Sequence, residues 1–165
     1  MKFVGMLVLL ILFAALLLLI AGRAGWLAGK QPTGLGVKDG RLQAPALTPN
    51  SVSSQADLYP DHPQRNYARV APFAFNGDGQ AAMQRLAVVL EATPRCTLVT
   101  RQPAYLYAQC STRLLKYTDD VEFALDETEG VIHVRSASRL GHGDLGANRA
   151  RVEGLRAQFA RQAAK

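Results

Sequence analysis

The sequence lacks the short motifs that mark the common cofactor and nucleotide sites. It has no P-loop and no G-x-G-x-x-G fingerprint of a dinucleotide-binding domain. Its two cysteines form no C-x-x-C pair, and its three histidines, His62, His133 and His142, show no metal-ligand spacing. The NGDG stretch at residues 76–79 lacks the other ligands of a calcium loop. We therefore expect no cofactor and no bound metal ion.

Aromatic residues are scarce where the chain is most basic, which argues against a nucleic-acid partner. Residues 135–165 carry seven bases and two acids, but Phe159 is their only aromatic side chain. A nucleic-acid surface would combine an uncompensated basic face with interleaved aromatics. Residues 119–129 hold six acids and no base, and we expect these acids to neutralise the basic segment across a sheet. No nucleic acid is expected as a partner.

One long apolar run is present near the N-terminus. Residues 3–22 are 20 residues without a charge, and a helix of that length spans about 30 Å, the thickness of a bilayer's hydrocarbon core. The run has no polar face and exceeds the usual apolar region of a signal peptide. We expect residues 1–23 to form a transmembrane signal-anchor helix. The alternative is a signal peptide that is cleaved near residues 22–24.

The expected location is the inner membrane, with a single pass and a periplasmic soluble domain. This expectation rests on the usual arrangement of a signal anchor followed by one domain. The flanking charges do not support it, because Lys2 precedes the helix whereas Arg23, Lys30, Lys38 and Arg41 follow it. The expected partners are the membrane, through the N-terminal helix, and a small anionic ligand, a lipid headgroup or an envelope protein.

The chain after the helix divides by composition. Residues 24–63 hold five glycines and five prolines, which is typical of a linker and irregular lead-in. Residues 64–165 show helical and strand-like patterns and should form the soluble domain. The expected helices cover about residues 78–94 and 145–162, and the expected strands cover residues 96–100, 104–115, 121–126 and 131–138. The fold class is therefore α+β, with an antiparallel sheet of about four strands covered by two helices.

Alternating apolar and polar residues predict the register of the last two strands. A hairpin that turns at residues 127–130 places Phe123 beside Val134. The same register sets Glu122 opposite Arg135. We expect this cross-strand ion pair to account for much of the separation between the acidic and basic segments.

A second predicted hairpin brings the two cysteines together. A turn centred on Pro103 pairs Thr100 with Leu106 and Cys96 with Cys110. A disulfide between these cysteines is feasible but tight at the spacing of directly opposed residues. It would form in an exported domain. Two buried thiols on the core face are the alternative.

Residues 135–156 combine arginines, serines, a histidine and an aspartate around a glycine loop. Asp144 is placed to cap the last helix, whose expected apolar stripe is Leu145, Val152, Leu155 and Phe159. The loop offers free N–H groups at a helix N-terminus, where an anion could bind, although the capping carboxylate competes for that position. The candidate ligand-binding residues are Arg135, Arg139, Asp144, Asn148 and Arg149, with Asp119 and Asp120 facing them.

Two other interpretations of this segment stay open. In the simpler one it is only the polar seam between a strand and a helix, with serines bonded to backbone and arginines paired with the acidic strand. In the other, Ser136 or Ser138 acts with His142 and Asp144 in an envelope hydrolase. The chain has no G-x-S-x-G elbow to support a hydrolase.

Three stretches resemble a known family. SVSSQA (residues 51–56), TDDVEF (118–123) and VRSASRLGHGDLGANRARVEGLR (134–156) are similar to the domain of unknown function 1499. The resemblance covers roughly residues 42–159 and implies an exported or membrane-tethered protein of bacteria, with relatives in plastids. Pro45 and Ser51 stand where that family typically has two cysteines, so we expect no redox role for this segment.

The resemblance assigns no activity, and therefore no catalytic residues. The favoured function is a non-enzymatic, membrane-anchored binding module of the cell envelope, and the hydrolase is its alternative.

Overall fold

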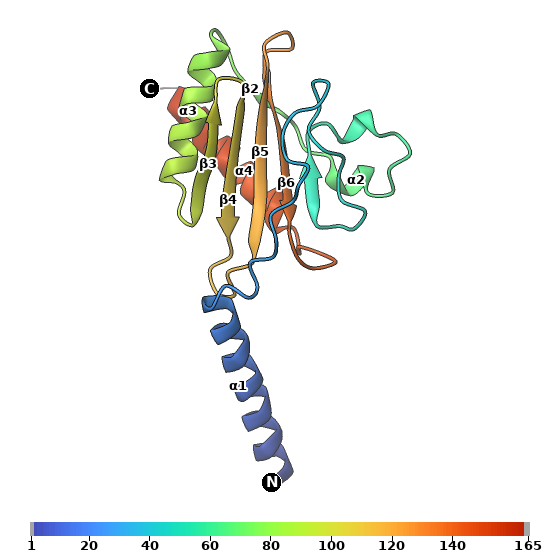
Figure 1. Cartoon of the computed structure of the whole chain (residues 1–165), viewed down its shortest axis with the longest axis vertical. Helices are drawn as coiled ribbons and strands as arrows, with labels where there is room; N and C mark the ends of the chain where they lie inside the picture. Colours follow the sequence, from blue (N-terminus) through green and yellow to red (C-terminus); the bar gives the residue numbers. More distant parts are fainter. Residues whose placement is uncertain (1, 164–165) are drawn as a thin grey trace.

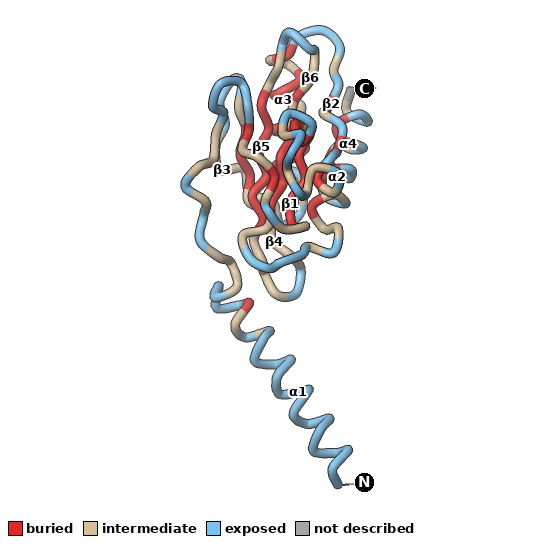
Figure 2. The backbone as a smooth tube through the Cα atoms, turned by 90° about the vertical axis from the view of Figure 1, so that its right-hand side faces the viewer, coloured by how far each residue is buried: buried red, intermediate tan, exposed pale blue. Residues whose placement is uncertain are grey.

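The computed structural model describes residues 2–163. Helix α1 (Lys2–Arg23) projects from the end of the folded domain, and it is long and apolar enough to cross a membrane. Figure 2 shows α1 exposed along its length except near its last turn, where Gly22 is buried. A Cβ on Gly22 would lie 2.6 Å from the carbonyl oxygen of Leu115. This glycine therefore permits a close contact between the end of α1 and the domain.

The sheet is antiparallel and has six strands rather than about four. Its strands are β1 (Ser51–Ser53), β2 (Phe73–Ala74), β3 (Cys96–Gln102), β4 (Tyr105–Ser111), β5 (Thr118–Asp126) and β6 (Val131–Ser138). The order is β1-β6-β5-β4-β3, and β2 also pairs with β6. The two extra strands are three and two residues long. Strands this short carry too few alternating positions to stand out in a sequence.

The predicted registers are largely confirmed. Glu122 pairs with Arg135 and Phe123 with Val134 in the β5–β6 hairpin. Cys96 lies opposite Cys110 in the β3–β4 hairpin, and the structure joins the two in a disulfide. The predicted pairing of Thr100 with Leu106 is wrong, because a bulge before Thr100 shifts the register. Thr100 pairs with Tyr107 instead.

Two helices cover one face of the sheet. Helix α3 (Gly79–Ala92) starts at Asp78, whose side chain accepts a hydrogen bond from the Gln80 N–H at 2.7 Å. Helix α4 (Ala147–Ala163) runs behind the strands in Figure 1. The core between helices and sheet is apolar, and its largest buried side chains include Phe73, Phe123, Leu86 and Leu155.

The start of α4 differs from the expectation. The helix begins at residue 147, and Leu145 is fully exposed with a positive φ of 51° instead of belonging to the apolar stripe. Val152, Leu155 and Phe159 do form that stripe and are buried. Two glycines flank this part of the loop, at Gly143 and Gly146. The backbone therefore turns just before the helix, and Leu145 is directed away from the core.

The opposite face of the sheet is covered by irregular chain from the segment expected to be a linker. We call residues 24–46 the N-terminal strap. It runs from the end of α1 along the sheet (Figure 1). The Gly36 N–H donates to Glu122 at 2.7 Å, and the carbonyl of Ala44 accepts from Arg135 at 3.2 Å. The strap thus buries strand side chains that alternation alone would leave facing solvent.

Short elements join the strap to the rest of the domain. The segment expected to be a linker also supplies β1 and a 3₁₀ helix at Ala56–Leu58. Residues 65–74 form helix α2 (Arg65–Ala68) followed by strand β2. Gln55 holds the strap in place, because its side-chain oxygen accepts from the Leu42 N–H at 2.8 Å.

Candidate functional site

A cavity of about 480 Å³ lies at the end of the domain that meets α1. We call it the α1-side pocket. Its lining residues are Leu27, Thr112, Tyr117, Asp119, Ser138, Leu140, Gly141, Gly143, Asp144, Leu145 and Ala147. The pocket is thus built by the β4–β5 connection, the loop that precedes α4, and the strap just after α1. Leucines supply its apolar wall.

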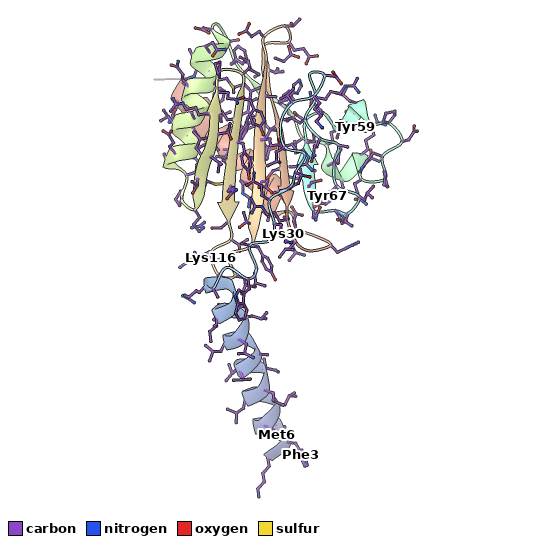
Figure 3. The ribbon with its side chains drawn as sticks, in the orientation of Figure 1. Phe3, Met6, Lys30, Tyr59, Tyr67 and Lys116 are labelled. Carbon is purple, nitrogen blue, oxygen red and sulfur yellow. A yellow bond between two sulfur atoms is a disulfide. The ribbon has the colours of Figure 1, made fainter. Side chains whose placement is uncertain are left out.

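The surroundings of this pocket combine exposed apolar and basic side chains. Trp26, Leu114 and Leu145 are exposed and lie in or next to the segments that line the cavity. Lys30 and Lys116 project where the domain meets α1 (Figure 3). Four basic side chains at this end, those of Arg23, Lys30, Arg113 and Lys116, form no ion pair with any other residue among positions 2–163.

The polar wall of the pocket is organised by Asn148, which is fully buried in the first turn of α4. Its amide nitrogen donates to Ser138 Oγ at 2.9 Å, to Asp144 Oδ2 at 2.8 Å and to the carbonyl of Asn50 at 3.0 Å. Its amide oxygen accepts from the Ser136 hydroxyl at 2.6 Å. Ser138 accepts in this network, and no hydrogen bond within residues 2–163 uses its proton. The Ser138 hydroxyl can therefore donate to a molecule in the pocket.

Asp119 lines the pocket from β5, and its negative charge is balanced by an arginine of α4. Its carboxylate accepts a hydrogen bond from the guanidinium of Arg151, and the Asp119 side chain is almost completely buried. Arg151 also donates to Asn148 at 2.8 Å and to Ser136 at 3.2 Å. The network is therefore held by a charge pair as well as by neutral hydrogen bonds.

Asp144 acts as a cap, although not at the position expected. One of its oxygens accepts from the Gly146 N–H at 3.0 Å and from the Tyr67 hydroxyl, and the other from the Asn148 N–H at 2.9 Å. Burial alone would raise the pKa of this carboxyl, but the hydrogen bonds from Tyr67, Asn148 and Gly146 outweigh burial and lower the pKa below its usual 3.8. Burial and the bond to Asp144 raise the pKa of the Tyr67 phenol.

Three of the predicted site residues lie on the other face of the sheet, under the strap. Arg139 donates to both oxygens of Asp120, at 2.9 and 2.7 Å, and this bidentate hydrogen bond raises the pKa of the guanidinium. The Asp120 carboxylate also accepts from the Tyr107 hydroxyl at 2.6 Å. Arg135 faces Glu122 at 3.5 Å. These residues do not face the pocket.

Arg149 is also occupied within the fold. Its guanidinium donates to the backbone carbonyls of Tyr67 and Arg69, at 2.8 Å in the second case. All three arginines of the predicted ligand site therefore have protein partners. Of the seven predicted ligand-binding residues, Asp119 and Asp144 line the pocket, and Asn148 holds its polar wall together.

The geometry does not join the residues of the hydrolase alternative. His142 is exposed, and within residues 2–163 it makes no hydrogen bond to Ser136, Ser138 or Asp144. The Ser136 hydroxyl donates to Asn148, and Asp144 caps α4. A nucleophile and its base need to lie within hydrogen-bond reach, at about 2.6–3.2 Å.

Sequence reasoning missed the residues that only the fold brings to this site. Tyr67 comes from the short helix α2 and Asn50 from the residue before β1, both more than 75 positions before Asp144 and Asn148, and no local pattern marks them. The exposed Leu145 was expected in the core. At the opposite end of the domain, the β5–β6 turn gathers Asp126, Glu129 and His133, whose spacing in the sequence shows no ligand motif.

Comparison with known proteins identifies a family. A family model described as "Protein of unknown function (DUF1499)" matches residues 41–159. The match spans the whole sheet, α3 and most of α4, and it confirms the resemblance seen in the sequence. No curated protein and no solved structure matches the chain.

Proposed function

The chain belongs to the DUF1499 family of proteins of unknown function, and we propose that it is a membrane-anchored module that binds a lipid-class ligand in the α1-side pocket. One observation carries the proposal: a leucine-lined cavity of about 480 Å³ lies beside the end of the helix that can cross a membrane. Ligand sites are commonly cavities of this size with apolar walls and a few convergent polar groups.

The position of the pocket favours a ligand that comes from the membrane. Leu27, which lines the cavity, follows the end of α1 by only four residues. With α1 as an anchor, the pocket stands at the height of the lipid headgroups. Exposed Trp26 fits that level, because the indole ring prefers the boundary between hydrocarbon and water. The basic residues at this end would attract anionic headgroups.

The polar wall favours a ligand with a hydroxyl- or amine-bearing headgroup. Asp119 and Asp144 provide acceptor oxygens, and Ser138 provides a free hydroxyl proton. The arginines expected to hold an anion are paired elsewhere. Among the expected partners, a lipid headgroup therefore fits the pocket better than a small free anion. The apolar part of the lipid would lie against Leu27, Leu140 and Leu145.

Lipid that co-purifies with the full chain tests this proposal. We would isolate the protein from membranes in a mild detergent and quantify bound lipid by mass spectrometry. Leu140→Glu and Leu145→Glu should each reduce bound lipid several-fold, because a carboxylate on the apolar wall makes burial of a chain costly. Both leucines are solvent-exposed, so these variants should stay folded.

Leu47→Glu is the matched control, because Leu47 is 75% exposed and lies outside the pocket. This variant has the same α1, so lipid that only surrounds the helix should be present in equal amounts in the control and in the pocket variants. Equal lipid content in wild type and all three variants would overturn the proposal.

For the location we propose the inner membrane, with the folded domain in the periplasm. The disulfide between Cys96 and Cys110 supports an oxidising compartment, whereas the bases that follow α1 oppose export. Protease added to spheroplasts should remove a C-terminal tag while a cytosolic marker survives. Protection of the tag until the membrane is broken would contradict export.

A further inference from the structure

Asp126, Glu129 and His133 form a compact cluster at the β5–β6 hairpin, the end of the domain farthest from α1 (Figure 1). Each residue offers one ligand atom, and these atoms lie within 4.8 Å of one another. His133 comes from β6 and Asp126 ends β5, so two strands of one hairpin hold them. Glu129 lies in the turn between those strands. The cluster is separate from the α1-side pocket.

The histidine ring is held by its other nitrogen. Nδ1 of His133 is 3.2 Å from the hydroxyl of Ser54, and that hydroxyl accepts from the Val134 N–H at 2.9 Å. The His133 side chain is only 12% exposed. Nε2 is therefore directed toward the two carboxylates. A metal-binding histidine usually has its second ring nitrogen fixed by such a hydrogen bond.

The two oxygens of the Asp126 carboxylate also have different partners. Oδ1 accepts from the N–H groups of Thr128 and Glu129, both at 2.9 Å, and so shapes the turn. Oδ2 is the atom that faces His133. In both Asp126 and His133, local structure uses one atom of the side chain, and the second atom points into the cluster.

The distances between the ligand atoms suit a shared cation better than direct hydrogen bonds. Nε2 of His133 is 3.9 Å from Asp126 Oδ2 and 3.7 Å from Glu129 Oε2, both beyond hydrogen-bond length. Two ligands on one tetrahedral ion, each at about 2.0–2.2 Å from it, lie roughly 3.4 Å apart. All three ligand atoms lie within 4.8 Å of one another, and rotation of the exposed Glu129 side chain can bring them closer around one ion.

We propose that Asp126, Glu129 and His133 bind a divalent transition-metal ion, with Zn²⁺ as the preferred cation. One imidazole and two carboxylates suit Zn²⁺ better than Mg²⁺ or Ca²⁺, which favour oxygen ligands alone. A cavity of about 660 Å³ adjoins the cluster and is lined by Asp126 and His133 together with Tyr105 and Glu127. Three protein ligands leave a coordination position open to a water or a small ligand in that cavity.

Zinc titration of the full chain in detergent, purified without a histidine tag, tests the site. Isothermal calorimetry should show one Zn²⁺ site per chain, and Co²⁺ should give the absorption bands of a tetrahedral site. His133→Asn and Glu129→Gln should each weaken Zn²⁺ binding by at least about tenfold. The Glu129 side chain is 66% exposed, so Glu129→Gln removes a ligand atom without removing packing.

Glu91→Gln and His62→Asn are the matched controls, since Glu91 is an exposed carboxylate near the end of α3 and His62 lies in a distant loop. Both variants should bind Zn²⁺ like wild type. The inference fails if wild type shows no stoichiometric site, or if that site survives in His133→Asn and Glu129→Gln. The readout does not depend on lipid, so its failure leaves the proposed function standing, and the reverse also holds.

Discussion

Both faces of the sheet are buried, one under helices and the other under irregular chain. The helices α3 and α4 cover one face and pack apolar side chains such as Leu86 and Leu155 against it. The strap covers the other face and encloses two ion pairs, Glu122 with Arg135 and Asp120 with Arg139. Helices can bury an apolar stripe because their backbone groups bond internally. A strap has no such internal pairing, so its N–H and C=O groups need polar partners on the strands.

This difference explains why charged residues alternate with apolar ones along β5 and β6. Glu122 is completely buried, and its Oε1 accepts from the Gly36 N–H at 2.7 Å and from the Tyr105 hydroxyl at 2.8 Å. Burial and the nearby Glu122 carboxylate raise the pKa of Tyr105, so its phenol stays a donor. Burial lowers the pKa of Arg135, although Glu122 opposes that shift. The backbone of the strap is thus hydrogen-bonded to charged side chains of the sheet that are buried from solvent.

The largest expected effect comes from breaking one ion pair under the strap. Arg135→Met leaves the buried Glu122 carboxylate without its cation, which should lower the free energy of unfolding by about 3–5 kcal/mol. Adding Glu122→Gln should recover more than half of that loss, because Gln keeps an acceptor for Gly36 and Tyr105. Urea unfolding of the full chain in detergent measures both values.

Leu155→Ala on the helix-covered face is the control for this pair. It should cost about 2–5 kcal/mol through the cavity it leaves. In the double variant, the decreases in unfolding free energy caused by Leu155→Ala and by Glu122→Gln should add, because the two side chains lie on opposite faces of the sheet. If Glu122→Gln rescued Leu155→Ala as well as it rescues Arg135→Met, the contrast between the two faces would be wrong.

A smaller effect on stability is expected at Asp144, because neutral donors rather than an arginine bond its carboxylate. Its pKa is lowered in the folded protein, so it contributes stability above about pH 4 that is lost as the pH falls through the folded pKa. In Asp144→Asn this pH dependence should disappear. The difference in unfolding free energy between wild type and variant should therefore be larger at pH 6 than at pH 3.

Asp61→Asn removes an exposed carboxylate from the loop before α2 and serves as the comparison. The change between pH 6 and pH 3 should be larger for Asp144→Asn than for Asp61→Asn. A pH-independent effect of Asp144→Asn would mean that its hydrogen bonds from Tyr67, Asn148 and Gly146 do not favour the ionised form.

Local sequence patterns predicted the features of this fold that depend on contacts between residues close in the sequence. Alternation along residues 121–135 is sufficient to place Glu122 opposite Arg135, because a hairpin joins the two strands through a short turn. The start of α3 is likewise local, since Asp78 bonds an N–H two residues ahead. Leu145 shows where a local pattern misleads, because a positive φ before α4 turns it out of the stripe.

The remaining features depend on contacts between distant segments. The strap touches Glu122 from 86 positions away and Arg135 from 91, and a Gly- and Pro-rich stretch carries no period that would reveal this. The candidate sites are similar: Tyr67 reaches Asp144 across 77 positions and Ser54 reaches His133 across 79. Tyr67 stands in no motif, and the SVSSQA stretch that contains Ser54 does not indicate that this serine contacts His133.

The apolar helix, the β5–β6 register, the pairing of Cys96 with Cys110, the helix cap at Asp78 and the family can all be read from the sequence. Each depends on residues that are close in the chain or on a recognisable sequence pattern. Which charges are buried, and where the pockets lie, depend on tertiary contacts. Burial of Glu122 and the wall of the α1-side pocket arise when the strap and the α4 loop close over the sheet. Desolvation of a side chain depends on what covers it, and the covering segments here lie far away in the sequence.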